Sequence, residues 1–231
     1  MFRNPHVRLV PVVEAYTGVL DDADLGPIGE PRWDAYCRER IVAAGLPAPV
    51  AAHPWLVPAV ELRGAGLARL VLASAFADEP DEPDDAALPD RLRDPATRQD
   101  ALEEVPALSG GYVLETREGR CLALPGCCGD LGDLDEWRTA LRHDDPAPAT
   151  LWIGHPWLLV SGDGSVLTLS GPVEDGAASA PMVARIARNA LTEAVAAADR
   201  EVERFAGHLR AVCADLVGAE AAPPVASALI G

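Results

Sequence analysis

The chain has 231 residues, with 36 acidic against 19 basic side chains, and its formal net charge is −17. A charge this negative repels phosphate backbones, so we do not expect nucleic acid as a partner. No run approaches the length of an apolar membrane span, and the N-terminal residues lack the apolar stretch of a signal peptide, so we expect a cytoplasmic protein that does not bind membranes.

The N-terminal part contains one predicted strand, one predicted helix and further apolar segments. Residues 7–15, VRLVPVVEA, are rich in β-branched side chains, which predicts a strand, and Pro11 favours an edge strand or a bulge. Residues 31–45 predict a helix because Pro31 lies in its first turn and Gly45 at its end. Its apolar face is typical of a core face, not of a binding site.

An acidic segment at 78–87 follows. It begins with DEPDEPDD, in which six of eight residues are acidic and two are proline. This composition cannot bury apolar surface, so we expect an exposed, flexible loop that divides an N-terminal part, 1–77, from a C-terminal part, 88–231. Both parts are expected to belong to one domain, 1–231, because so few aromatic residues give the N-terminal part a thin core.

The C-terminal part begins with a short predicted helix around 96–105. Residues 110–124 then predict a β-hairpin, because apolar runs flank a glycine-containing turn. Residues 150–171 predict one short strand and a second hairpin, turned at 162–164. A long helix is predicted over 181–217, followed by a loose apolar tail. The expected fold class is therefore α+β, with a mostly antiparallel sheet, hairpins, flanking helices and one long C-terminal helix.

The stretch LALPGCCGDLGDLDEW, residues 122–137, contains adjacent cysteines between glycines. No zinc spacing such as CxxC is present, and adjacent side chains on an extended chain point to opposite sides, so we expect no metal there. Reduced thiols are expected, since five cysteines form an odd set in a cytoplasmic chain. Nearby carboxylates also disfavour a nucleophilic thiolate.

We interpret the same stretch as a strand-to-helix connection. Asp133 and Glu136 have the spacing of a capping box, which predicts that a helix starts there. Leu134, Trp137 and Leu141 follow at the spacing of one buried helix face. The two cysteines are then expected to be small, buried apolar side chains beneath the turn.

The sequence HPWL occurs twice, at 53–56 and 155–158. Either a duplicated unit or chance would explain this repeated sequence, and no further similarity between the two regions supports duplication. The histidines could bind a ligand together with the tryptophans, but aromatic residues before apolar strands usually pack inward, which favours a core role. An enzyme or small-molecule-binding protein using Cys127 or Cys128 with His155 stays an alternative.

The predicted long helix contains apolar residues spaced alternately by three and four positions. This seam is typical of helices that pair with another helix, so we predict a homodimer that Phe205→Glu weakens. The alternatives are a break near Gly207, with two helices over one sheet, and a scaffold protein that assembles through this helix. The expected contact residues are Leu191, Val195, Val202, Phe205, Leu209 and Val212.

The order GGYVLE…LALPGCCGDLGDLDEWRTAL…LWIGHPWLLV, over about residues 109–171, resembles uncharacterised bacterial toxin-immunity-type proteins. More distantly it is similar to the SUKH superfamily of immunity proteins. The resemblance implies an α+β fold that binds and blocks a partner protein, and it carries no catalytic residues over. The absence of lysine and the abundance of alanine, glycine, proline and arginine agree with a bacterial source.

We therefore expect a cytosolic protein-binding module, an immunity-type inhibitor of a basic bacterial toxin, and not an enzyme. No phosphate-binding loop or other catalytic motif occurs, and no cofactor or metal is expected. Acidic side chains attract a basic partner and accelerate its capture. The expected partner-binding residues are Asp81, Glu82, Asp84, Asp85, Asp21, Asp22 and Asp24.

Overall fold

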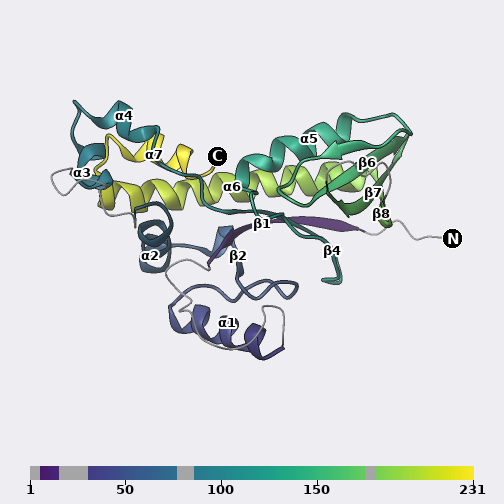
Figure 1. Ribbon diagram of the computed structural model, residues 1–231, viewed down its shortest axis with the longest axis horizontal. Helices are drawn as coiled ribbons and strands as arrows, with labels where there is room; N and C mark the ends of the chain where they lie inside the picture. Colours follow the sequence, from purple (N-terminus) through teal and green to yellow (C-terminus); the bar gives the residue numbers. More distant parts are fainter. Residues whose placement is uncertain (1–5, 16–30, 77–85, 175–179) are drawn as a thin grey trace. The chain divides into compact units, whose positions relative to one another are not determined.

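The computed structural model describes residues 6–15, 31–76, 86–174 and 180–231 (Figure 1). Within these ranges there are two four-stranded sheets, of order β2-β1-β3-β4 and β5-β6-β7-β8, and a set of helices. This confirms the α+β class with antiparallel strands and one long C-terminal helix. All seven acidic residues expected to contact a partner lie outside the described residues.

The chain forms two compact units. Unit 1 contains residues 1–12 and 109–202, and unit 2 contains residues 13–108 and 203–231. Each unit is therefore discontinuous in sequence. The chain passes between them within strand β1 (Val7–Glu14), between Leu108 and Ser109, and within helix α6 (Arg188–Val217). The division expected at the acidic segment, 78–87, stays a prediction.

Unit 1 holds most of the strands. Its elements, besides its parts of β1 and α6, are β3 (Gly110–Thr116), β4 (Cys121–Ala123), the short 3-10 helix η2 (Leu131–Asp133), α5 (Leu134–Arg142), β5 (Ala149–Leu151), β6 (Trp157–Asp163), β7 (Val166–Val173) and β8 (Met182–Ala187). Both predicted hairpins are present, because β3 pairs with β4 and β6 pairs with β7 in antiparallel register.

Strand β1 is not an edge strand. It has β2 (Leu56–Pro58) on one side and β3 on the other, so the expectation that Pro11 marks an edge is wrong. The strand is buried along nearly its whole length, including Pro11. Burial of a nearly continuous apolar run holds the strand in the sheet interior although proline cannot donate a hydrogen bond.

Helix α6 begins later than the sequence predicts. Residues 182–187 form β8, which pairs with β7 from Ser170 back to Val166, and the helix starts only at Arg188. The side chain of Arg188 donates hydrogen bonds to the carbonyl oxygens of Gly164 (2.8 Å), Leu141 and His143 (2.9 Å). These bonds fix the junction between strand and helix to the neighbouring turn and to the end of α5.

Unit 2 is mainly helical. Its elements, besides its parts of β1 and α6, are α1 (Pro31–Ala43), β2, the 3-10 helix η1 (Ala59–Glu61), α2 (Gly64–Ala75), α3 (Leu88–Arg93), α4 (Arg98–Leu102) and α7 (Ala222–Ala228). The expectation of a loose tail is wrong, because α7 buries Ala222, Val225 and Ala226. The chain after α7 is also fixed, since the Leu108 amide donates to the Leu229 carbonyl oxygen (3.0 Å).

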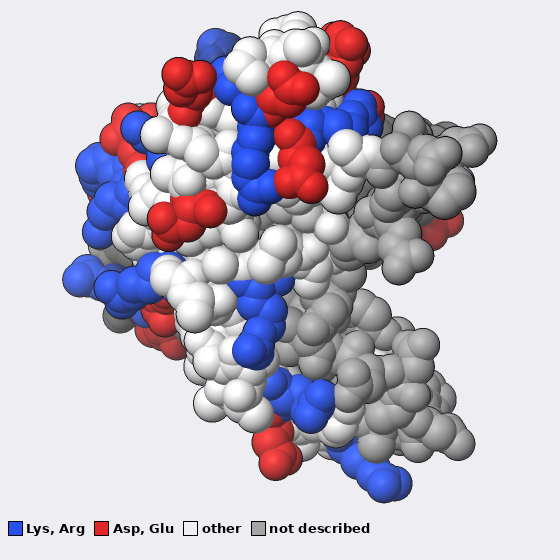
Figure 2. All heavy atoms as spheres, turned by 90° about the vertical axis from the view of Figure 1, so that its left-hand side faces the viewer, with Lys and Arg blue, Asp and Glu red and all other residues white. Residues whose placement is uncertain are grey.

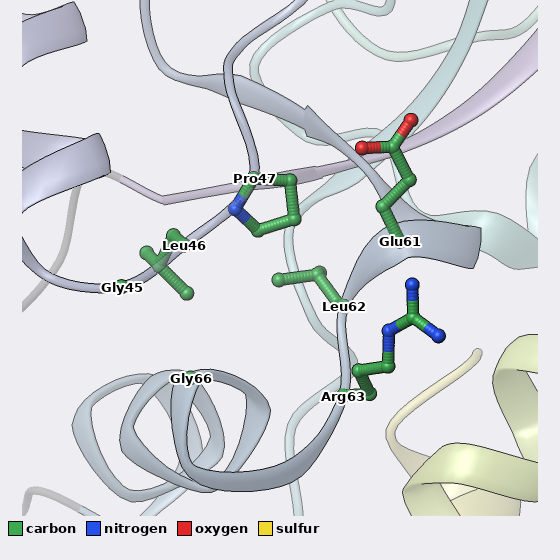
Figure 3. Close-up of a pocket in the computed structure, with 7 residues that line it drawn as sticks. All are labelled: Gly45, Leu46, Pro47, Glu61, Leu62, Arg63 and Gly66. Carbon is green, nitrogen blue, oxygen red and sulfur yellow. The ribbon is translucent and has the colours of Figure 1, made fainter.

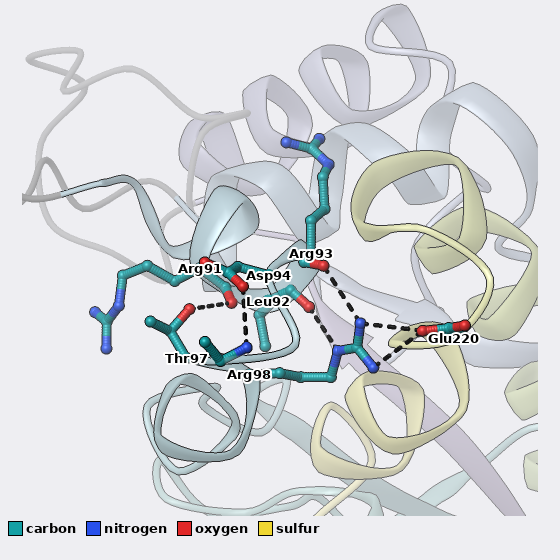
Figure 4. Close-up of polar contacts among 8 residues, drawn as sticks. Arg91, Leu92, Arg93, Asp94, Thr97, Arg98 and Glu220 are labelled. Atoms are coloured by element: carbon teal, nitrogen blue, oxygen red, sulfur yellow. Dashed lines mark hydrogen bonds and ion pairs between the residues drawn. The ribbon is translucent and has the colours of Figure 1, made fainter.

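Arginine side chains hold the helix ends of unit 2 together (Figure 4). Arg98 donates to the carbonyl oxygens of Leu92 (3.0 Å) and Arg93 (3.3 Å) at the end of α3, and it contacts the Glu220 carboxylate at 3.4 Å. Arg93 in turn donates to the Leu216 carbonyl oxygen near the end of α6. The last carbonyl groups of a helix have no partner within the helix, so these bonds satisfy them.

Positive and negative side chains lie side by side on the face drawn in Figure 2. Of the 36 acidic residues in the chain, 11 fall outside the described ranges, against one of the 19 arginines. The described residues therefore carry less than half of the net charge of −17. Most of the excess negative charge belongs to the segments that were expected to contact a partner.

The apolar seam of α6 is covered within a single chain. Phe205 and Leu209 are fully buried, as is Leu191, and Val202 is partly buried. The helix is continuous through Gly207, so the expected break there is absent. Burial of the seam needs no second copy, and the homodimer stays a prediction.

Candidate functional site

We call residues 126–129 the cysteine turn. It follows β4 and comes shortly before η2. Backbone hydrogen bonds within the turn and to the 152–157 segment fix it. The Gly126 amide donates to Ile153 O (2.7 Å), the Cys127 amide to His155 O (3.0 Å), and the Gly129 amide to Gly126 O (3.2 Å). The last bond joins residues three apart, so the two cysteines are the central residues of a β-turn.

The cysteine turn packs directly against the backbone of the 152–157 segment. A Cβ built on Gly126 would lie 2.3 Å from the Gly154 carbonyl carbon and 2.4 Å from the His155 nitrogen. One built on Gly154, whose φ is +88°, would lie 2.7 Å from the Gly126 carbonyl carbon. Only glycine allows the two backbones to approach this closely.

Cys127 and Cys128 are both exposed, and their Sγ atoms lie 3.4 Å apart. The expectation of buried cysteines is therefore wrong. The expectation that adjacent side chains diverge also fails, because it holds for an extended chain, whereas these residues occupy the centre of a turn. The other three cysteines differ, since Cys37 and Cys213 are buried and Cys121 is half-buried.

The predicted capping box is displaced by three residues. The Asp130 carboxylate accepts a hydrogen bond from the Gly132 amide (2.7 Å), and the Asp133 carboxylate accepts one from the Asp130 amide (3.2 Å). These two aspartates cap η2, and Asp133 makes no side-chain cap to α5. Glu136 instead accepts from the Trp152 amide at 3.3 Å. The interpretation of a strand-to-helix connection holds, with Leu134 and Trp137 buried.

The pKa of Asp133 is raised to about 6, mainly by burial. The hydrogen bond from the Asp130 backbone lowers it, and the charges of Asp130 and Glu136 add to the rise. A raised folded-state pKa means that the native state favours the protonated acid. The contribution of Asp133 to stability is therefore complete below the unfolded value of 3.8 and is lost as the pH rises through about 6.

Asp133→Asn is accordingly expected to stabilise the protein at about pH 8, by about 1 kcal/mol after allowance for solvent screening, and to give no gain at about pH 4. Asparagine keeps the oxygen that accepts from the Asp130 amide and removes the charge. Urea unfolding at both pH values measures the difference. Asp163→Asn, at an exposed position, is the matched control, and an equal gain at both pH values would contradict the expectation.

Trp152 and Trp157, at the two ends of the 152–157 segment, form a stacked pair. Their ring centroids lie 4.6 Å apart with an interplanar angle of 23°. Trp157 is buried in a small apolar cluster with Leu159 and Val173, whereas Trp152 keeps 50% of its surface exposed. Trp152 therefore stacks its indole on Trp157 and keeps half of its surface in solvent.

In both HPWL sequences the histidine ring contacts the tryptophan ring, but the exposure of the histidine differs. His53 contacts Trp55 edge-on at 4.3 Å, and His155 contacts Trp157 in a similar way at 5.4 Å. His53 is part-buried, and burial lowers its pKa, whereas His155 is exposed. The core interpretation holds for Trp157, and the exposed His155 lies next to the cysteine turn through its backbone contact with Cys127.

Unit 2 contains a pocket of about 330 Å³ at the start of α2 (Figure 3). Its lining residues are Gly45, Leu46, Pro47, Glu61, Leu62, Arg63 and Gly66. The charged side chains of Glu61 and Arg63 rise from the side opposite Gly45 and Leu46, and both residues are exposed. Because these charges are opposite and exposed, the pocket does not favour one sign of ligand.

The structure brings together Cys127, Cys128 and His155, which the sequence analysis named for the alternative function. Trp152, three residues before His155 and 50% exposed, was not singled out by the sequence analysis. The signal that could have found Trp152 is its position just after a short predicted strand and away from the apolar alternation of the next one. Its half-exposed position includes stacking on Trp157, and no sequence pattern encodes that contact.

Searches with family models, among curated proteins and among solved structures found no match to this chain. Within the described residues, no helix has the combination of length and low charge that a membrane span requires.

Proposed function

We propose that the chain is a cytoplasmic protein-binding module, an immunity-type inhibitor of a basic bacterial toxin. The observation that carries the proposal is the exposed half of Trp152 on an acidic protein. Exposed tryptophans that rest on a rigid base are enriched among residues that dominate protein–protein binding energies. Stacking on Trp157 supplies such a base, because it holds the Trp152 ring in one orientation before a partner arrives.

The surroundings of the tryptophan pair favour a cationic side chain of the partner. The Glu136 carboxylate accepts from the Trp152 amide and so lies 3.3 Å from the backbone of that residue. Glu174, which is exposed, directly follows Val173 of the apolar cluster beneath the pair. An arginine or lysine of the partner would contact the indole face through a cation–π interaction and these carboxylates through charge.

The acidic segments have a separate role in this proposal. Asp81, Glu82, Asp84 and Asp85, with Asp21, Asp22 and Asp24, would attract the basic partner over a distance and accelerate association. The tryptophan pair would then supply affinity after contact. The two roles are separable, because charge acts mainly on the association rate and is screened by salt.

The test is binding to the purified protein encoded by the neighbouring gene, measured by calorimetry at low and at high ionic strength. We expect Trp152→Ala to weaken binding by about 2 kcal/mol, about 30-fold in Kd. Val42→Ala removes an equally exposed apolar side chain, 55% exposed, from α1 and is expected to leave the affinity unchanged. Replacing the four acidic residues at 81–85 by their amides should slow association mainly at low salt.

Three results would overturn the proposal: no binding, binding that neither salt nor the amide variant changes, or equal effects of Trp152→Ala and Val42→Ala. Co-expression of the chain with the neighbouring protein provides a functional readout. The wild-type chain is expected to restore growth that the neighbouring protein inhibits, and Trp152→Ala is expected to restore it less.

A further inference from the structure

The cysteine turn presents two thiols in a fixed arrangement. Cys127 and Cys128 are exposed and free, with Sγ atoms 3.4 Å apart. Three backbone hydrogen bonds and the close contact of Gly126 with Gly154 hold the turn. Neither thiol needs a backbone rearrangement to approach a common ligand, so a ligand that bonds to both sulfurs meets a preorganised pair.

The distance between the two sulfur atoms indicates which kind of sulfur-binding atom the pair can hold. With bonds to sulfur of about 2.3 Å, a distance of 3.4 Å corresponds to an angle of about 95° at the bound atom. A tetrahedral zinc site would place two sulfurs about 3.8 Å apart and needs four ligands. Among the described residues, no group of three or more His, Cys, Asp or Glu side chains is placed to hold a metal ion. A linear two-coordinate centre would need the sulfurs about 4.6 Å apart at the same bond length.

We propose that Cys127 and Cys128 form a bidentate binding site for trivalent arsenic, as arsenite or as a mono-substituted organoarsenical. Trivalent arsenic is pyramidal, with bond angles near a right angle, and it prefers sulfur to oxygen. This site is independent of the partner surface at Trp152, since the thiols bind the arsenic without a contribution from either indole.

The binding reaction is a condensation without a change of oxidation state. An organoarsenical oxide, R–As=O, reacts with the two thiols to give R–As(S-Cys127)(S-Cys128) and one water. Two As–S bonds form, two S–H bonds break, and the oxygen leaves with both protons. The hydrogen bond with the Cys127 side chain raises the pKa of Cys128 above its ordinary value, which favours the thiol form of Cys128 that this stoichiometry uses.

The experiment uses phenylarsine oxide as the probe and intact-protein mass spectrometry as the readout, after reduction with a phosphine. We expect one adduct per chain, with the mass of the probe less one water. Excess monothiol should leave the adduct in place, and a dithiol such as 2,3-dimercaptopropanol should remove it, because only a dithiol replaces both As–S bonds together. Cys127→Ser and Cys128→Ser are each expected to lose the adduct that resists monothiol.

Cys121→Ser is the matched control, because it removes a half-buried thiol of the neighbouring strand and leaves the pair intact. This variant is expected to form the adduct as the wild type does. Alkylation of the two exposed thiols on the folded wild-type chain is also expected to abolish the adduct that resists monothiol, without any substitution. The proposal is overturned if the wild type forms no monothiol-resistant adduct, or if either serine variant or the alkylated protein still forms one.

Discussion

Gly126→Ala is expected to lower the free energy of unfolding by about 3 kcal/mol or more. The new Cβ would lie 2.3–2.7 Å from three backbone atoms of Gly154 and His155, closer than real Cβ atoms approach. Backbone atoms cannot move aside as a flexible side chain can. The cysteine turn would have to separate from the 152–157 segment, with loss of the hydrogen bonds to Ile153 and His155.

Urea unfolding, monitored by circular dichroism, measures this decrease in the free energy of unfolding. Gly207→Ala is the control, because a Cβ there meets no atom within 4 Å and the residue lies inside α6. We expect that variant to be more stable than the wild type by up to about 1 kcal/mol, since alanine favours a helix interior over glycine. Equal stabilities for Gly126→Ala and the wild type would show that the backbone contact is not part of the folded state in solution.

Phe205→Glu is expected to destabilise the folded chain by at least about 4 kcal/mol. Phe205 is fully buried in α6, so the substitution removes a packed aromatic ring and places a carboxyl group among apolar side chains. Burial would raise the pKa of the new carboxyl group. The destabilisation should therefore be larger at about pH 8 than at about pH 4, where the new carboxyl group is protonated.

The same variant separates the two roles of the α6 seam. If the seam served mainly to join two copies, Phe205→Glu would give a folded monomer with little loss of stability. If the seam is part of the core, the variant unfolds at a lower urea concentration than the wild type. This loss of stability is then not accompanied by a change from dimer to monomer in the mass measured by light scattering. Glu203→Gln, at an exposed position of the same helix, is expected to leave both measurements unchanged.

Patterns that act over a few residues were sufficient to predict much of the fold. The apolar face of α1 and that of α5 follow from side chains spaced three and four apart, and both faces are buried. The two hairpins follow from glycine-containing turns between apolar runs. These predictions succeed because helix period, strand alternation and turn chemistry are properties of neighbouring residues.

Residues 182–187 show where local pattern is insufficient. Their apolar residues are compatible with an extension of α6, and the sequence predicts a helix there. Pairing with β7 makes them a strand instead, with Ala184 and Ile186 buried. A strand gains its hydrogen bonds from a partner distant in sequence, so the pairing partner and not the local pattern decided this element.

The sequence by itself determined the charge, the fold class, the helices with a regular apolar face and the location of an unusual turn at the two cysteines. Only the tertiary structure decided that the thiols are exposed and 3.4 Å apart, and that Trp152 stacks on Trp157 with half of its surface in solvent. The turn that carries the thiols meets the 152–157 segment through the close approach of Gly126 and Gly154. Contacts between segments so far apart along the chain depend on how the whole unit packs, and no spacing within either segment encodes them.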